Sequence, residues 1–156
     1  SDGDYNASIK LYLKGGYPAK AANLVKLYGI GNFDNQLLEN IVKTLLQVGI
    51  FDKAGEILEL MGHFKRALEA YHKGACFSKA VELAKKNIQN MVEKLEEEWG
   101  DYLSSQKHNE EAIIHYIEGN CKDKAIEAAI IARKWDKAIE LCNKAPMEIA
   151  KHYYAD

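Results

Sequence analysis

Histidine and cysteine are the residues whose spacing could indicate a metal site in this chain, because both side chains ligate zinc. His72 and Cys76 lie four residues apart, which can place two ligands on one face of a helix. Gly74 lies between them, however, and is expected to end that helix. His108 and His115 lie seven residues apart, and no third or fourth ligand converges on either pair. The spacing therefore predicts no metal site and favours surface or interface positions for the five histidines, which are His63, His72, His108, His115 and His152.

Acidic and glycine-rich stretches offer two further kinds of chemistry. The run Glu96 to Glu98 contains neighbouring carboxylates of the kind used in general acid–base catalysis. Because Leu95 and Trp99 are expected to face the core from the same helix, the run is predicted to form its solvated face. The stretch Gly29 to Gly31 follows no strand and precedes no Gly-Lys-Ser/Thr motif, so a loop is predicted and not a phosphate site. No catalytic, cofactor-binding or metal-ligating residue is predicted, and no enzyme activity is expected.

The composition indicates that helices must position whatever function the chain has. Its 156 residues are 47% apolar and 28% charged, and the net charge of −2 gives no basic footprint for nucleic acid. There are only two prolines and no strand-like alternation, which favours an all-α protein. No apolar run approaches the ~20 residues of a membrane helix, and no signal-peptide pattern is present. The three widely spaced cysteines never form a Cys-x-x-Cys pair, which indicates a reducing compartment.

Apolar periodicity predicts two long helices, each followed by three short ones. The long helices are expected at about residues 33–48 and 88–105, and Gly49 is expected to end the first with a left-handed cap. Two helices at about residues 5–13 and 18–28 precede them, the second opening with Pro18 in a tolerated first-turn position. The short helices share an anchor alanine, found at Ala54, Ala67 and Ala80 in the first group and at Ala112, Ala125 and Ala138 in the second.

The stretch from Glu96 to Tyr116 has the pattern of a tetratricopeptide helix pair. Counted from Gly100, Ala112 lies at i+12 and Tyr116 at i+16. A glycine on one helix and an alanine on the next allow the two backbones to approach closely, and Trp99 and Tyr116 can then fill the space beside the contact.

The anchor alanines recur at a fixed interval. Within each group they lie at i, i+13 and i+26, and every member of the second group lies at i+58 from its counterpart in the first. This recurrence predicts an α-solenoid of degenerate tetratricopeptide-like hairpins with about eleven helices. We expect one solenoid segment made of a preceding tail (1–32), a first super-unit (33–87), a second (88–145) and the start of another helix (146–156). Because neither end shows a polar cap and the chain begins without Met, it is expected to be cut from a longer array.

The most specific part of the sequence is EEEWGDYL followed by AIIHYIE, within the segment Leu95–Cys142. This segment resembles the helical-repeat region of the intraflagellar transport protein 172 family, whose members are peripheral subunits of intraflagellar transport complex B. The likeness extends upstream through PAKAANLV (Pro18–Val25) and the stretch Ala54–Ala84, so that it covers nearly the whole chain.

The resemblance implies a non-enzymatic scaffold that supports cilium assembly and cargo transport along ciliary microtubules. It implies other complex B subunits as partners, and the cilium or flagellum and the ciliary base, on the cytoplasmic side, as the location. No cofactor, nucleic acid or small-molecule substrate is expected. Two alternatives stay open, a vesicle-coat-like solenoid and a peptide-binding module of the co-chaperone type. The second would need a basic clamp for a carboxylate, for which Lys43, Lys53 and Arg66 are candidates by type although their spacing forms no evident clamp.

Overall fold

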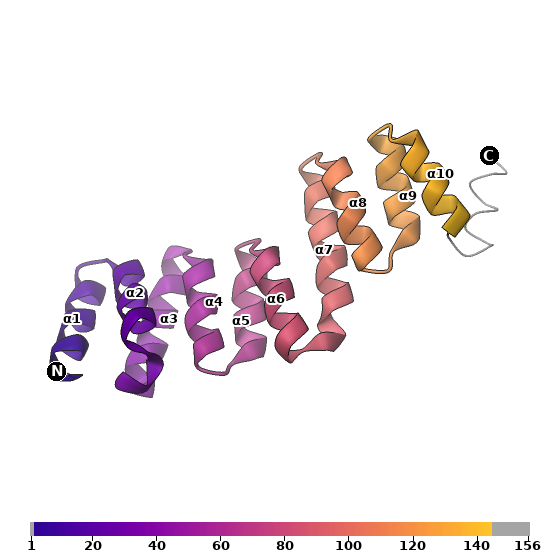
Figure 1. The fold of residues 1–156 in the computed structure, drawn as a ribbon. Helices are drawn as coiled ribbons and strands as arrows, with labels where there is room; N and C mark the ends of the chain where they lie inside the picture. The colour runs from indigo at the N-terminus through magenta and orange to yellow at the C-terminus, as the bar shows by residue number, and fades with distance from the viewer. Residues whose placement is uncertain (1, 145–156) are drawn as a thin grey trace. The chain divides into compact units, whose positions relative to one another are not determined.

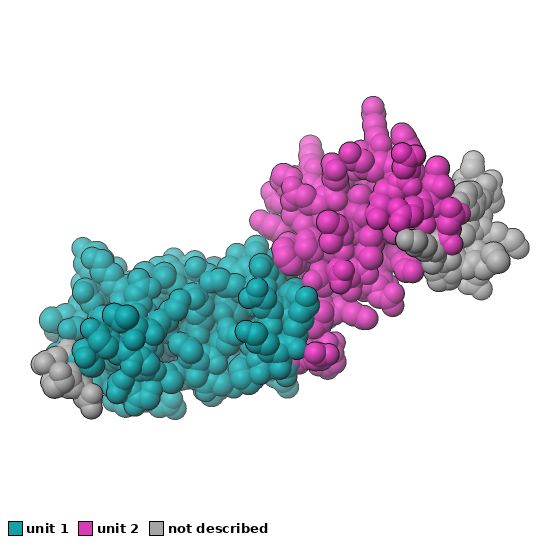
Figure 2. Space-filling view, viewed as in Figure 1, with its two compact units in different colours: residues 1–87 teal, residues 88–156 magenta. Residues whose placement is uncertain are grey.

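The computed structural model describes residues 2–144, and every regular element in that range is helical. Ten α-helices and two short 3₁₀ turns lie in these residues, and no strand. The chain separates into two compact units, residues 1–87 and 88–156 (Figure 2). The predicted all-α solenoid is therefore confirmed over residues 2–144, whereas the helix expected after residue 146 lies outside the described residues.

The first unit is a stack of six α-helices in which each helix packs against the next one along the chain (Figure 1). Helix α2 also contacts α4, so helices two apart in sequence meet as well, as expected for stacked hairpins. The helices are α1 (Asp2–Lys14), α2 (Pro18–Tyr28), α3 (Asn35–Val48), α4 (Phe51–Leu60), α5 (Phe64–Lys73) and α6 (Phe77–Asn87), with the 3₁₀ turn η1 (Ile30–Asn32) between α2 and α3.

The ends of α3 show how local sequence sets the helix boundaries. The Asp34 side chain accepts a hydrogen bond of 2.7 Å from the Leu37 backbone N–H, so α3 begins at Asn35 and not at the predicted residue 33. Gly49 ends α3 in the left-handed conformation, with φ +84° and ψ 20°, which confirms the predicted cap. The Gly29 to Gly31 stretch, predicted as a plain loop, contains the start of η1.

The second unit contains the 3₁₀ turn η2 (Gln89–Met91) and the helices α7 (Val92–Ser105), α8 (Asn109–Glu118), α9 (Lys122–Ile131) and α10 (Trp135–Lys144). The long helix predicted from residue 88 therefore begins four residues later. Ile88 has φ −142° and ψ 69°, outside the helical region, and the chain re-enters the helix only through η2.

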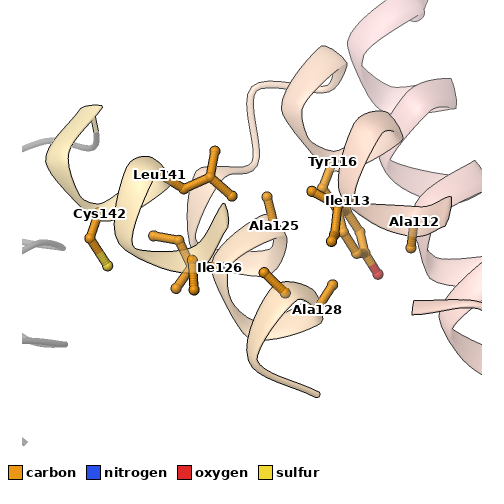
Figure 3. Packing of buried hydrophobic residues seen from close by; sticks show 10 residues of the cluster. Ala112, Ile113, Tyr116, Ala125, Ile126, Ala128, Leu141 and Cys142 are labelled. Carbon is orange, nitrogen blue, oxygen red and sulfur yellow. The ribbon is translucent and has the colours of Figure 1, made fainter. Parts of the chain in front are cut away.

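Apolar faces of α8, α9 and α10 meet in one cluster of the second unit (Figure 3). Ile126 of α9 is fully buried there, and Leu141 of α10 is 4% exposed. In both units the predicted anchor alanines lie in the core, where their small side chains allow close helix packing. Ala54, Ala67, Ala80, Ala112 and Ala125 are fully buried, and Ala138 is 6% exposed.

Two glycines mark the closest helix crossings. Gly100 of α7 lies against the ring of Tyr116 in α8, and a Cβ at this position would come within 2.7 Å of a ring carbon. Gly55 of α4 lies against Tyr71 of α5 in the same way, and a Cβ there would overlap the ring. The predicted close approach at Gly100 is thus confirmed. The structure adds the equivalent crossing at Gly55. Counted from Gly55, Gly100 lies at i+45, and Tyr116 lies at the same interval from Tyr71.

Candidate functional site

The acidic run on α7 is partly buried, which corrects its prediction as a solvated face. The Glu96 side chain is only 7% exposed, and its Oε2 lies 2.9 Å from Nδ1 of His115 on α8. Trp99 stacks on the His115 ring with a centroid separation of 3.7 Å and an interplanar angle of 20°. Because α8 packs over this face of α7, it covers Glu96 and supplies the polar partner that a buried carboxylate needs.

The arrangement around Glu96 is that of a packed carboxylate–imidazole pair. It contains one carboxylate, one imidazole and one indole, and the carboxylate and the imidazole are each other's polar partners beneath the indole ring. Among the side chains that the structure describes, no group of three or more histidine, cysteine or acidic residues is placed to hold a metal ion. His72 contacts Phe77 edge-on, and α5 ends at Lys73 before reaching Cys76, as Gly74 predicted. His152 lies outside the described residues.

The buried tyrosines of the two glycine crossings are held by hydrogen bonds. The Tyr116 hydroxyl donates to Oδ1 of Asp101 at 2.7 Å and lies 3.2 Å from the Ser104 hydroxyl. Burial raises the pKa of Tyr116, the Ser104 bond opposes this rise and the Asp101 bond adds to it. The Tyr71 hydroxyl donates to Oε2 of Glu59 at 2.8 Å, and burial followed by this bond holds its pKa well above the ordinary value. Both hydroxyls therefore stay protonated at neutral pH.

Ion pairs connect helices that lie two apart in the chain. In the first unit Glu56 of α4 lies between Lys26 of α2, at 2.7 Å, and Lys79 of α6, at 3.2 Å. In the second unit the signs are reversed, because Lys124 of α9 lies 2.7 Å from Glu97 and 3.3 Å from Asp101 of α7. Glu97 is thus a second member of the acidic run with a specific structural contact.

A groove follows α3 in the first unit, with α1 on one side and α5 on the other. It has two lobes, of about 470 Å³ between α1 and α3 and about 500 Å³ between α3 and α5. Asn40, Lys43 and Gln47 of α3 line both lobes. These residues occupy successive turns of one helix face, at i, i+3 and i+7.

The groove brings together two of the three basic residues considered for a clamp. Lys43 and Arg66 both line the lobe between α3 and α5. The Arg66 side chain already has a partner there, because its guanidinium donates to both carboxylate oxygens of Glu39 at 2.7 and 2.9 Å. Lys53 lies elsewhere and donates to Asn23 of α2 at 2.9 Å. The three candidates therefore form no common clamp.

Sequence reasoning missed two lysines of this groove. Lys10 and Lys14 of α1 line its other lobe together with Lys43. The whole of α2 separates them from Lys43 along the chain, and only the stacking of α1 beside α3 brings the three side chains to one surface. The available signal was the i, i+4 spacing of Lys10 and Lys14, which places both on one helix face.

Within residues 2–144, no helix combines the length and the apolar character that crossing a membrane would require. The three cysteines carry free thiols, with Cys142 buried and Cys76 and Cys121 half-buried. Burial is the main cause that raises the pKa of both half-buried thiols, so neither is an activated nucleophile. The three thiols therefore behave as small apolar side chains.

The comparisons with known proteins agree on one family. The model of the tetratricopeptide (TPR) domain family named for intraflagellar transport proteins 140 and 172 matches residues 1–155. The chain is 46% identical over 154 residues to the intraflagellar transport protein 172 homolog of Homo sapiens. It is 42% identical over 137 residues to intraflagellar transport protein 172 of Chlamydomonas reinhardtii and 33% identical over 157 residues to intraflagellar transport protein osm-1 of Caenorhabditis elegans. The alignments cover 88% to 100% of this chain but only 8% to 9% of these relatives.

Proposed function

Because this chain belongs to the TPR domain family of intraflagellar transport proteins 140 and 172, we propose that it is a non-enzymatic scaffold segment of the intraflagellar transport complex B machinery. In this role it supports cilium assembly and the transport of cargo along ciliary microtubules. Its partners are other complex B subunits, and it acts on the cytoplasmic side of the cilium or flagellum and at the ciliary base.

The observation that carries the proposal is the match to intraflagellar transport relatives over nearly the whole chain. The described fold supports it, because stacked hairpins present extended surfaces for partners. The polar side chains at the two glycine crossings are engaged in packing. Glu96 and His115 pair with each other, and the two tyrosine hydroxyls donate to acids in their own units.

Affinity capture from ciliated cells tests the proposal. The chain should enrich complex B subunits above the level captured by a variant with Gly55→Trp and Gly100→Trp. Both substitutions insert an indole into a crossing that has no room for a Cβ, so the variant loses its folded surface while keeping nearly the same composition. Recovery of heat-shock chaperone tails without complex B subunits would contradict the ciliary role.

A further inference from the structure

We infer that the lobe between α1 and α3 binds an acidic segment of a partner polypeptide. The inference rests on the proposed scaffold function, because it names the chemistry of one partner surface. Lys10, Lys14 and Lys43 line this lobe, and none of the acidic side chains that the structure describes does. Among the described side chains, those of residues 5–143, the three ammonium groups make no ion pair, in contrast to Arg66 in the neighbouring lobe, which is held by Glu39.

Neutral polar groups of the same lobe suit a polypeptide backbone. Asn40 and Gln47 line the lobe, and within the described part of the chain neither amide side chain makes a hydrogen bond. Each amide can donate to a carbonyl and accept from a backbone N–H. Thr44 lies between them and donates to the Asn40 backbone carbonyl at 2.8 Å, so its proton is already used.

Apolar side chains complete the lobe. Leu37 is 6% exposed and Leu13 is half-buried, and both line it. An occupant that fits therefore carries carboxylates for the three lysines, backbone groups for the two amides and a small apolar side chain for the leucines. An acidic polypeptide has all three features.

Other polyanions fit this surface less well. A nucleic acid is usually bound along a basic stripe, whereas this chain has a net charge of −2. The basic surface also ends at the next lobe, where the Glu39 carboxylate neutralises Arg66. A membrane surface offers no backbone amides to pair with Asn40 and Gln47.

The direct test is the binding of a short labelled peptide of Glu, Leu and Gly, followed by fluorescence anisotropy. The whole chain should bind it, and the affinity should fall as salt is raised. Replacing Lys10, Lys14 and Lys43 together with Gln should weaken binding about tenfold, which corresponds to ~1.4 kcal/mol.

A matched variant separates the groove from overall charge. Lys73, Lys86 and Lys94 are exposed and make no ion pair among the described residues, and replacing all three with Gln changes the net charge by the same amount. This control should bind the peptide as the parent chain does. Equal weakening in both variants, or equal binding of a peptide with Gln in place of Glu, would overturn the inference. So would preferential binding of single-stranded DNA or of phosphatidylserine vesicles.

Capture from ciliated cells distinguishes this inference from the proposed function. If the parent chain captures complex B subunits and the groove variant captures fewer, both stand. If both chains capture them equally, the groove is not the docking site although the scaffold function stands. If the parent chain captures none, the scaffold function fails, and the groove inference falls with it even where the peptide binds.

Discussion

The hairpins α4–α5 and α7–α8 share the same glycine–tyrosine contact between their two helices. They differ in the residues at the positions that flank this contact. In each, a glycine on the first helix lies under a tyrosine ring on the second, at Gly55 and Tyr71 and again at Gly100 and Tyr116. The positions that flank the crossing are apolar in the first unit and polar or aromatic in the second. They are Phe51, Ala54 and Ala70 in α4–α5 and, at i+45 in each case, Glu96, Trp99 and His115 in α7–α8.

This difference separates what the repeat requires from what it tolerates. The glycine–tyrosine contact is set by backbone geometry, because any side chain at the glycine would meet the ring. The flanking space accepts either apolar packing or a buried polar pair covered by an indole. Buried pairs of this kind often add little to stability over an apolar core, but removing one partner alone is costly. The two hairpins therefore make natural references for each other.

The largest effect is expected from breaking the buried pair. His115→Ala should lower the free energy of unfolding by about 3 kcal/mol, because Glu96 is left buried without a partner. Adding Glu96→Phe, which reproduces Phe51 and Ala70 of the other hairpin, should recover most of the loss. Both tryptophans lie in the second unit, so urea unfolding followed by tryptophan fluorescence reports on it directly.

The exposed His108 provides the control for these two variants. Its side chain is 57% exposed and lies 3.9 Å from Glu111, so His108→Ala should leave the unfolding curve nearly unchanged. A double variant as unstable as His115→Ala alone would show that the two hairpins are not interchangeable beside the crossing.

The crossings themselves should be intolerant of a single methyl group. Gly55→Ala and Gly100→Ala should each cost about 1–3 kcal/mol, because overpacking outweighs the gain in helix propensity. The first should cost more, since the added Cβ lies closer to its tyrosine ring. Circular dichroism during thermal unfolding measures both, and Gly31→Ala serves as the control, because a Cβ there meets nothing within 4 Å and φ is not positive. Stabilisation by either helical substitution would contradict the close crossing.

The anchor alanines should respond alike in the two units. Ala67→Leu and Ala112→Leu should each lower stability by about 1–2 kcal/mol, because both positions are fully buried between helices. Differential scanning calorimetry tests this, with leucine at the exposed Ala7 of α1 as the control. An unchanged melting temperature would place these alanines away from helix interfaces.

The smallest effects concern the ion pairs, whose reversed signs predict opposite pH dependence. Burial raises the pKa of Glu56, but the hydrogen bonds from Lys26 and Lys79 outweigh it, so the pKa is lowered. Its contribution is present above the ordinary glutamate pKa of about 4.3 and is lost as pH falls through the lowered value. Glu56→Gln should therefore flatten the acid side of the stability profile, by about 0.5 kcal/mol.

Lys124 should affect the alkaline side instead. The hydrogen bond from its ammonium to Glu97 is the main cause that raises its pKa, and burial opposes it. The stability it contributes is present below the ordinary lysine pKa of about 10.4 and is lost as pH rises through the raised value. Lys124→Gln should flatten the profile there by a few tenths of a kcal/mol, since the group is partly exposed. Urea titrations at a series of pH values measure the stability of both variants. If Glu56→Gln and Lys124→Gln changed stability in the same pH range, the reversed signs of the two ion-pair groups would be contradicted.

The sequence predicted much of the fold because its main signals are local. The anchor alanines, the Gly49 cap and the glycine crossing at Gly100 each depend on spacing within one helix or one hairpin. The burial of Glu96 could not be predicted in this way, because three consecutive glutamates look alike until α8 covers one side of α7. The groove was missed for the same reason, since Lys10 and Lys43 come to line one lobe only when α1 lies beside α3.

Because the chain belongs to this family, replacing the matching segment of a relative with this chain is the most direct test of the scaffold function. The matching stretch of the Homo sapiens relative would be replaced by this chain, which is 46% identical to it over 154 residues, in cells that lack that relative. Measuring the amount of the hybrid that co-purifies with complex B, and the length of the cilia, should give values near those of the unaltered relative. A stable hybrid that fails to join the complex, in cells whose cilia do not recover, would contradict the account.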